Sequence, residues 1–578
     1  MKADNRYRGF LSSIQTLRSI FFTLPIIFKI IVLACVSVGT ITLSIYLWQK
    51  NIDLMVEIPA PYGSFTEGVV GNPRFINPIL AVSDVDKDLT TLIYSGLMRK
   101  KSDGSLIEDL AQSHTISEDF KTYHFILKPD LTWHDGTPIT TKDIAYTINS
   151  TKNPDLKSPF QSLWNNVTVE IKNDREITFS LNKPFPGFLE MLSLGILPAH
   201  IWSNIDINNF AFSEYNLDPI GSGPYKIDKI KKDSAGVPTL FELKSFKNFA
   251  LGKPHINQIN LHLYPNETLL IADYEQGQID SMNSVNPSYV EKIKSADKRI
   301  ITTPLPRVFG LFFNQNQNPI FTQAEVREAL DLLIDKNYIV ENVLNGYGTV
   351  VNGPLSPQTF GYEAIKSTDI EADQRSQTSL DILTKNGWTP NKDGILMKKI
   401  NGSDTLLKLT ITTTDSEELK TIASFVKTQW EKIGIQVDII VLDQNTLNQE
   451  AIRPRKYDVL LFGMVIGNEA DLYSFWHSSQ RSDPGLNISF YTSVQTDNLL
   501  AKLEDTNNKE QRRDLVRQIQ NTIASDHPAV FMYSPYFIYA APKDVQNIEI
   551  KYLTRSSDRL LQIYDWYIDT EYIWKIFK

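Results

Sequence analysis

The chain has 578 residues, of which 42% are hydrophobic and 22% charged, as in ordinary globular proteins. This length exceeds what one hydrophobic core usually organises, so we expect two or three lobes. Residues 1–50 carry six Lys or Arg and one Asp, a charge of +5, so the formal net charge of −9 leaves −14 on residues 51–578. An acidic portion of this size argues against a nucleic-acid partner, because phosphate binding needs a basic surface.

An apolar segment near the N-terminus, residues 30–48, holds 19 residues without a charge. About 20 such residues span a bilayer, so we expect one transmembrane helix. Five basic residues precede it against one Asp, which predicts a cytoplasmic N-terminus and an extracytoplasmic bulk. A cleaved signal peptide is the alternative, but its apolar core is shorter, about 7–15 residues. Cys35, the only cysteine, lies in this segment, so we expect no disulfide outside the membrane, and lipidation of Cys35 stays open.

Short elements separated by turns follow. Alternating apolar residues and turn signals predict a helix over 84–98 and strands over 123–127, from Leu131, and over 176–181. His134 and Asp135 are adjacent in an extended segment, so their side chains point to opposite faces and a catalytic pair is not expected.

A strand, a polar turn and two helices are predicted over 309–348. Alternation over 309–313 indicates the strand. Thr322 is expected to cap the first helix, with Glu325 completing a capping box. Asp335 is expected to cap the second helix, and Gly346 to end it.

The stretch from residue 406 to 533 predicts an α/β lobe. Strands are expected over 406–412, 435–442, 457–462 and 527–533, with a helix capped by Asp415 between the first two and another over 509–525. A strand, helix, strand order implies parallel pairing through a right-handed crossover. Ligands of such lobes bind at the C-terminal ends of strands. The loop 464–476 is therefore expected to face a cleft.

Motifs of common enzymes are absent from the sequence. There is no HExxH, no Gly-x-Ser-x-Gly and no Walker A sequence, and the eight His form no close cluster. We therefore expect no catalytic residues, no metal site and no cofactor. A membrane-anchored hydrolase with a carboxylate pair remains the competing class.

Segments in a fixed order along the chain resemble the peptide-binding proteins of ABC importers, the oligopeptide- and dipeptide-binding group of solute-binding proteins, family 5. The 309–348 stretch contains Asn314, the sequence Pro-Ile-Phe at 319–321, the sequence Val-Arg-Glu-Ala-Leu at 326–330, and the sequence Ile-Asp-Lys at 334–336. Further matching segments extend from Gly71 to Phe531, and they include Trp133–Pro138 and Gly221–Tyr225. Glu328 and Lys336 depart mildly from the usual Gln and Arg.

The resemblance implies a periplasmic-binding-protein type II-like α/β fold, with two lobes and a third subdomain around a ligand cleft, behind one N-terminal transmembrane helix. It also implies that the lobes close about a hinge on a peptide ligand, whose main chain is held by backbone groups. The expected partners are an ABC permease and its ATPase, with the membrane bound through the N-terminal helix. Because the chain is rich in aromatic residues, an oligosaccharide is the alternative ligand.

The resemblance also suggests ligand-binding residues. In the family, an acid in the loop matching 464–476 pairs with the ligand's amino terminus. The usual position is occupied here by Gly467, so amine recognition is either moved to Glu469 or Asp471 or absent. Arg307 can meet a ligand carboxylate bidentately, although an ordinary surface arginine is the more common case. The predicted ligand-binding set is Gly467, Asn468, Glu469, Asp471, Tyr473, Trp476, Asn314, Phe65 and Tyr94.

The predicted boundaries follow from the same reasoning. They are a basic cytoplasmic segment (1–29), the transmembrane anchor (30–48), a tether (49–62), lobe I in three parts (63–88, 213–301 and 536–578), subdomain II (89–212) and lobe III (302–535).

Overall fold

A computed structural model describes residues 19–23, 25–185, 187–294, 299–366, 370–371, 373–400, 402–467, 469, 471–483, 485–506 and 508–577. The chain forms two compact units. The first is Met1–Ala60 with Asp569–Lys578, and the second is Pro61–Ile568.

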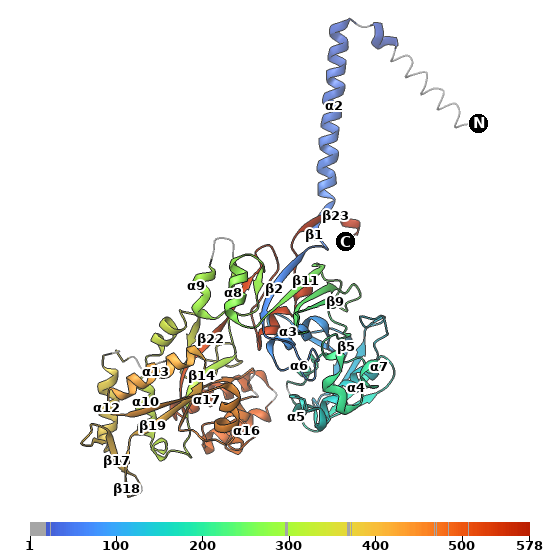
Figure 1. The fold of residues 1–578 in the computed structure, drawn as a ribbon. Coiled ribbons are helices and arrows are strands. Elements are labelled where there is room, and N and C mark those ends of the chain that lie inside the picture. The colour runs from blue at the N-terminus through green and yellow to red at the C-terminus, as the bar shows by residue number, and fades with distance from the viewer. Residues whose placement is uncertain are drawn as a thin grey trace. The chain divides into compact units, whose positions relative to one another are not determined.

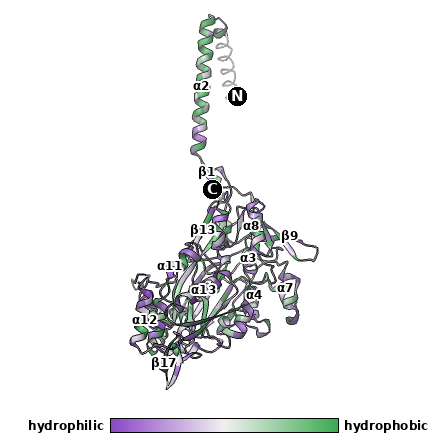
Figure 2. Cartoon of the chain, turned by 60° about the vertical axis from the view of Figure 1, so that its left-hand side comes forward, coloured by the Kyte–Doolittle hydropathy of each residue, from purple (hydrophilic) through white to green (hydrophobic). Residues whose placement is uncertain are grey.

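The first unit consists of a long apolar helix and a two-stranded ribbon. Helix α2 (Ile26–Asp53) has 28 residues, a mean hydropathy of 2.4 in its most apolar window, and no buried side chain. Its apolar character is visible in Figure 2. Strand β1 (Met55–Pro59) pairs antiparallel with β23 (Thr570–Trp574). Within the predicted tether over 49–62, the end of α2 reaches Asp53 and the extended strand β1 covers Met55–Pro59.

One large mixed sheet organises the second unit (Figure 1). Its strand order is β20-β19-β21-β14-β22-β12-β2-β11-β10-β9, with β13 and β15 also paired to β22. The bounds are β2 Ser64–Val70, β9 Tyr225–Lys232, β10 Pro238–Ser245, β11 Gln258–Tyr264, β12 Ser281–Met282, β13 Arg299–Pro304, β14 Arg307–Phe313, β15 Gly348–Val350, β19 Lys408–Thr414, β20 Gln436–Leu442, β21 Val459–Val465 and β22 Ala529–Ala541.

Strand β22 joins two hydrophobic cores. Its first half pairs with β14 and β15, and its second half pairs with β13 and β12. Val530 and Met532 belong to the core around β14 and β19, whereas Phe537 and Tyr539 belong to the core around β2 and β11. A single continuous strand thus connects the two halves of the sheet, as a hinge element would.

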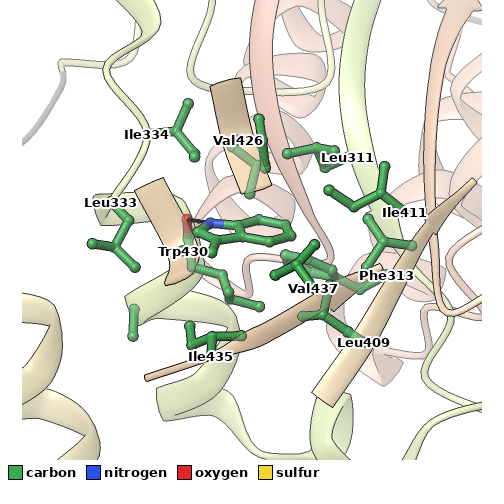
Figure 3. Packing of buried hydrophobic residues seen from close by; sticks show 14 of the residues in the cluster. Leu311, Phe313, Leu333, Ile334, Leu409, Ile411, Val426, Trp430, Ile435 and Val437 are labelled. Atoms are coloured by element: carbon green, nitrogen blue, oxygen red, sulfur yellow. Dashed lines mark hydrogen bonds between the residues drawn. The ribbon is translucent and has the colours of Figure 1, made fainter. Parts of the chain in front are cut away.

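The predicted α/β lobe is confirmed at the β20 end of the sheet. Strand β19 pairs in parallel with both β20 and β21, and α13 (Glu417–Glu431) makes the crossover. Its apolar face packs on the strands, with Trp430 at the centre (Figure 3). The indole nitrogen of Trp430 donates a 3.0 Å hydrogen bond to the Leu330 carbonyl, so this buried polar atom is satisfied.

A smaller sheet has its own core. Strands β5 (Ala111–Ile116), β6 (Thr122–Leu127), β8 (Glu176–Leu181) and β7 (Val167–Ile171) lie in that order, and α4 (Thr141–Lys152) contributes Ile144 and Ile148 to the core. Other helices used below are α3 Asp84–Ile93, α10 Ala324–Leu332, α15 Asp471–Trp476, α16 Val494–Glu504 and α17 Lys509–Ser525.

Several sequence predictions needed correction at element ends. Helix α10 starts after Gln323, because Thr322 closes a preceding 3-10 turn by donating to the Pro319 carbonyl. Glu325 therefore forms no capping box and pairs with Lys398 instead. Helix α3 ends at Ile93, five residues early, because Tyr94 is extended. The expected strand from Leu131 is only an isolated bridge.

Further boundary corrections are small. The helix expected from Asp415 begins after Ser416, and the strand expected over 457–462 runs instead from Val459 to Val465. Asp335 caps the second helix as predicted, because its side chain accepts a hydrogen bond from the Tyr338 amide. The predicted end of that helical segment at Gly346 is also confirmed, and Gly346 has a φ of 80°.

Three buried charges tie distant segments of the second unit together. Arg559 is bidentate to Asp88, with both N–O distances 2.8 Å, and also contacts Glu67. Tyr539 donates a 2.8 Å hydrogen bond to the other oxygen of Glu67. All three charged side chains are at most 2% exposed. Burial raises the pKa of Asp88, although Arg559 opposes the shift.

Candidate functional site

The end of β21 presents an open strand edge. On one side the whole of β21 pairs with β14, from Val459↔Phe313 to Val465↔Arg307. On the other side it pairs with β19 only at Val459 and Leu460. Among the described strands, none adjoins residues 462–465 on that side. We call this segment the β21 edge. Its backbone groups are placed to pair with an extended ligand.

A cleft of about 760 Å³ lies against the β21 edge. We call it the basic cleft, because three arginines and two acids line it: Arg307, Arg453, Arg455, Glu418 and Asp483. The ring of Phe309 forms part of its wall and stacks on Tyr533 with ring centroids 5.0 Å apart. Gly463 lies opposite Phe309 in the ladder, and a Cβ there would come within 2.8 Å of the ring. Glycine at 463 is therefore what lets Phe309 lie flat over the strand.

Arg307, the first residue of β14, is a charged residue that lines this cleft. Its side chain is exposed, and no carboxylate in the described part of the chain forms an ion pair with it. Surrounding protein atoms nonetheless lower its pKa by desolvation, with Asp84 and then Glu418 opposing the shift. Burial raises the pKa of Glu418, which accepts a 2.6 Å hydrogen bond from Tyr533. Glu418 is thus engaged by the tyrosine, and Arg307 is available to an anionic group.

A second cleft of about 610 Å³ lies beside the loop that follows β21. We call it the acidic cleft, because four acids and two bases line it: Glu469, Asp471, Glu504, Asp505, Lys183 and Arg512. Pro184 and Phe185 contribute its wall from the segment after β8, and Tyr473 and Ser474 contribute from α15. Burial raises the pKa of Glu504. The net negative lining suits a cationic group such as an amine.

The two acids predicted for amine recognition differ in their surroundings. Glu469 pairs with the buried Arg512, both guanidinium contacts being 3.2 Å. Arg512 also donates to the Leu503 and Thr506 carbonyls, so it is fixed in place. Asp471 accepts a 2.8 Å hydrogen bond from the Gly467 amide through Oδ2. Glu469 is thus paired with an arginine of the fold, whereas Asp471 holds the Gly467 amide and also lines the acidic cleft.

Gly467 connects the loop to the C-terminal segment of the same unit. Its carbonyl accepts a 2.8 Å hydrogen bond from the Tyr552 hydroxyl. A Cβ at this position would meet the Asp471 carboxylate at 3.6 Å and Thr554 at 3.7 Å, which are ordinary contacts. The structure therefore offers no steric reason for glycine here, in contrast to Gly463.

The structure brings together only part of the predicted set. Glu469, Asp471 and Tyr473 line the acidic cleft, and Tyr473 also stacks on His477 with centroids 4.2 Å apart. Asn468 lies outside the described residues. The predicted loop itself reaches both clefts, since Met464 and Phe475 line the basic one.

Four other predicted residues have core surroundings. Trp476 packs against Tyr491 and Phe531 and is 1% exposed. Asn314 is buried and holds its turn, accepting from the Asn316 and Gln317 amides. Phe65 packs on Trp566. Tyr94 is buried in the same core and lines a small cavity of about 90 Å³. We do not retain these four in the proposed site.

Lys87, Lys183 and Phe185 were missed by sequence reasoning. Lys87 on α3 has a pKa lowered by burial, with Arg555 and Arg307 among the nearby charges that lower it further. No motif marks these residues: Lys183 and Phe185 enter the acidic cleft from the segment after β8, and Lys87 lines the small cavity of about 90 Å³ beside Tyr94. The sequence marked Pro184–Phe188 only as the start of a helix, with no indication of a cleft.

No group of three or more His, Cys, Asp or Glu placed to hold a metal ion occurs among the described residues. A hinge-linked pair of α/β cores around strand-end clefts defines the type II periplasmic-binding-protein class. Residues 105–484 match the family described as bacterial extracellular solute-binding proteins, family 5 Middle, and the chain belongs to this family. The expected fold class is confirmed, and the relatives are solute-binding proteins rather than enzymes.

Known proteins of this kind cover most of the chain. The oligopeptide-binding protein AppA of Bacillus subtilis is 27% identical over 495 residues, which is 84% of this chain and 89% of AppA. The structure of that protein with a nonapeptide covers 89% of this chain and all of the AppA chain, at 26% identity and a TM-score of 0.70. NikZ of Campylobacter jejuni, in complex with Ni(L-His), covers 88% of this chain and all of NikZ, also at 26% identity and 0.70.

Proposed function

We propose that this protein is the peptide-binding component of an ABC importer, held outside the membrane by α2. The observation that carries the proposal is the β21 edge, an unpaired strand segment that lies in a cleft large enough for several residues. An extended peptide can add to such an edge through main-chain hydrogen bonds, which are indifferent to side-chain identity. The peptide-bound structure of the relative AppA is consistent with this choice of ligand.

The charges of the two clefts suggest how a peptide is oriented. The acidic cleft, with Asp471, would receive the free amine. The basic cleft, with Arg307, would receive the carboxylate or an acidic side chain. The loop after β21 lines both clefts, so a ligand on the β21 edge would be within reach of either charge. Charge-assisted hydrogen bonds at the ends would add about 1.5–3 kcal/mol each to a backbone-mediated interaction.

Closure is proposed to occur about β22 and the β13–β14 connection, since these segments join the two cores. The hydrogen bond from Tyr552 to the Gly467 carbonyl would be one of the contacts that hold the closed form. The closed protein would then dock on a permease whose ATPase lies inside the cell. Ligand would be released unchanged, so no turnover is expected.

The anchor and the domain boundaries form part of the proposal. Helix α2 is long enough to span a bilayer, at about 42 Å for 28 residues. We propose that it stays uncleaved, with the N-terminus in the cytoplasm. Lobe I (63–88, 213–301, 536–578), subdomain II (89–212) and lobe III (302–535) are proposed as the bodies that move.

A thermal-shift experiment on the full-length protein in detergent tests the ligand class. Three probes are compared: a peptide library with free amines, the same library N-acetylated, and a mixture of oligosaccharides. Ligand at 100 times its Kd stabilises the folded state by about 2.7 kcal/mol. We expect a raised melting temperature with the free peptides only. Stabilisation by oligosaccharides alone would favour the alternative ligand, and hydrolysis of either probe would favour an enzyme.

A further inference from the structure

The C-terminal segment of the chain is built against the outer end of α2. Strand β23 pairs with β1 over five residue pairs, from Met55↔Trp574 to Pro59↔Thr570 (Figure 1). The Ala60 amide extends the ribbon by donating to the Asp569 carbonyl at 2.9 Å. Strand β23 thus lies directly beyond the last turn of the apolar helix, although more than 500 residues separate the two in sequence.

Lys575 joins the ribbon to the helix end. Its amide donates a 2.8 Å hydrogen bond to the Leu54 carbonyl, and its ammonium donates a 2.6 Å hydrogen bond to the Asp53 carbonyl. The last carbonyls of a helix lack intrahelical partners, and a cation there also suits the helix dipole. These contacts would be lost if a protease removed α2.

One face of the ribbon exposes two aromatic side chains, with Glu57 of β1 opposite Tyr572. Because side chains alternate along a strand, Tyr572 and Trp574 share a face, and both are exposed, at 64% and 43%. Ile576, just past β23, is 78% exposed. On the other face of the ribbon, Val56 and Ile573 are half-buried. Within the first unit the ribbon has only two strands, and such a ribbon is marginally stable in water unless an apolar surface supports it.

The position of this face relative to the helix identifies what covers it. Tyr46 and Trp48, in the last two turns of α2, are 55% and 65% exposed, as expected for an aromatic belt at the membrane surface. Trp574 lies close to this end of α2, because its partner in the ribbon, Met55, is only two residues beyond Asp53, the last residue of the helix. Tyr572 follows two residues further along the same strand. Tyrosine and tryptophan are the residue types that favour the lipid headgroup region.

We propose that β1 and β23 form a juxtamembrane clasp whose exposed face, with Tyr572, Trp574 and Ile576, lies in the headgroup region of the lipid bilayer. The clasp rests on the proposed anchoring by α2. It returns the C-terminus to the membrane surface, so that two chain segments rather than one connect the ligand-binding unit to the anchor. The partner is the lipid itself rather than a protein.

The test uses nitroxide spin labels on the full-length protein, with Cys35 replaced by Ala, in nanodiscs of equal parts phosphatidylglycerol and phosphatidylethanolamine. Single cysteines are placed at positions 571–574 and 576. Collision with oxygen, which concentrates in lipid, is compared with collision with a water-soluble nickel chelate. We expect the oxygen-to-nickel ratio to alternate, several-fold higher at 572 and 574 than at the matched positions 571 and 573, and high again at 576.

A ratio that is uniformly low along 571–576 would overturn the proposal. If the ratio rises at 572 and 574 only when a permease shares the nanodisc, the partner is a protein and the proposal is wrong. A disulfide between Val56→Cys and Ile573→Cys, on the opposite face, checks the clasp independently; failure to form it would refute the pairing itself. The intact mass of the protein from its native membrane shows whether α2 is still present. Peptide binding is measured on the same samples, so that failure of the clasp can be told apart from failure of the proposed function.

Discussion

Replacing Arg559 by Met should strongly destabilise the second unit. The substitution removes both 2.8 Å contacts to Asp88 and the contact to Glu67, and it leaves two carboxylates that are 0% and 1% exposed without a cation. Breaking a buried ion pair from one side costs about 3–5 kcal/mol. Solvent does not screen these groups, so the full range applies. We expect this loss in the free energy of unfolding, measured by urea denaturation of the full chain in detergent.

The matched control is the neutral triple variant, Arg559→Met with Glu67→Gln and Asp88→Asn. Because the stranded charges are gone, it should recover most of the lost free energy. A loss below about 1 kcal/mol for Arg559→Met, or a triple variant no more stable than the single one, would show that the cluster is not what ties these segments together.

The pH dependence of the same variant has a defined sign. Burial raises the pKa of Asp88 in the folded state, and removing Arg559 takes away the main opposing influence. A group whose folded pKa is raised contributes stability at low pH and loses it as the pH rises through the folded pKa. The deficit of Arg559→Met should therefore shrink as the pH falls from about 8 toward about 5, whereas a deficit that grows would contradict the assignment.

Three further predictions concern the clefts. Asp471→Asn should weaken binding of free-amine peptides by about 1.5–3 kcal/mol and leave N-acetylated peptides unaffected, as measured by calorimetry; equal losses for both would place the amine elsewhere. Arg307→Ala should weaken peptides with a free carboxylate more than C-amidated ones, and an unchanged ratio between them would remove Arg307 from the site. Gly463→Ala should lower the melting temperature and peptide affinity, since its Cβ meets Phe309 at 2.8 Å, whereas Gly467→Ala, with contacts of 3.6 Å and beyond, should be tolerated; the reverse order would refute the packing argument.

The sequence predicted the C-terminal α/β lobe well, because its signals are local. Helix α13 shows a regular apolar stripe from Leu419 to Trp430, and the flanking strands alternate apolar with polar residues, Leu409 and Ile411 in β19 and Val437 and Ile439 in β20. The loop 464–476 could be placed near a cleft because the strand before it was recognised, although its end was expected at Gly463 and β21 continues to Val465. Its neighbours in space were not predictable in this way, because Lys183 and Phe185 reach the acidic cleft from another core.

Residue roles within predicted segments were less reliable. Trp476 was predicted to face the cleft because it lies on the loop after the strand, but α15 turns it inward onto Tyr491 and Phe531. Thr322 had the pattern of a helix cap, yet the 3-10 turn Pro319–Thr322 uses its hydroxyl first. The ribbon β1–β23 was missed entirely, since its two strands are short and lie at opposite ends of the chain.

The most direct test of the central claim, that this protein binds peptides at the β21 edge, is native mass spectrometry of the full-length protein purified in mild detergent. We predict bound masses that fragment as peptides, and we predict that Asp471→Asn reduces their retention without altering the fold. A protein that retains no peptide, takes up none from a free-amine library, or carries only glycans or metal complexes would contradict the account.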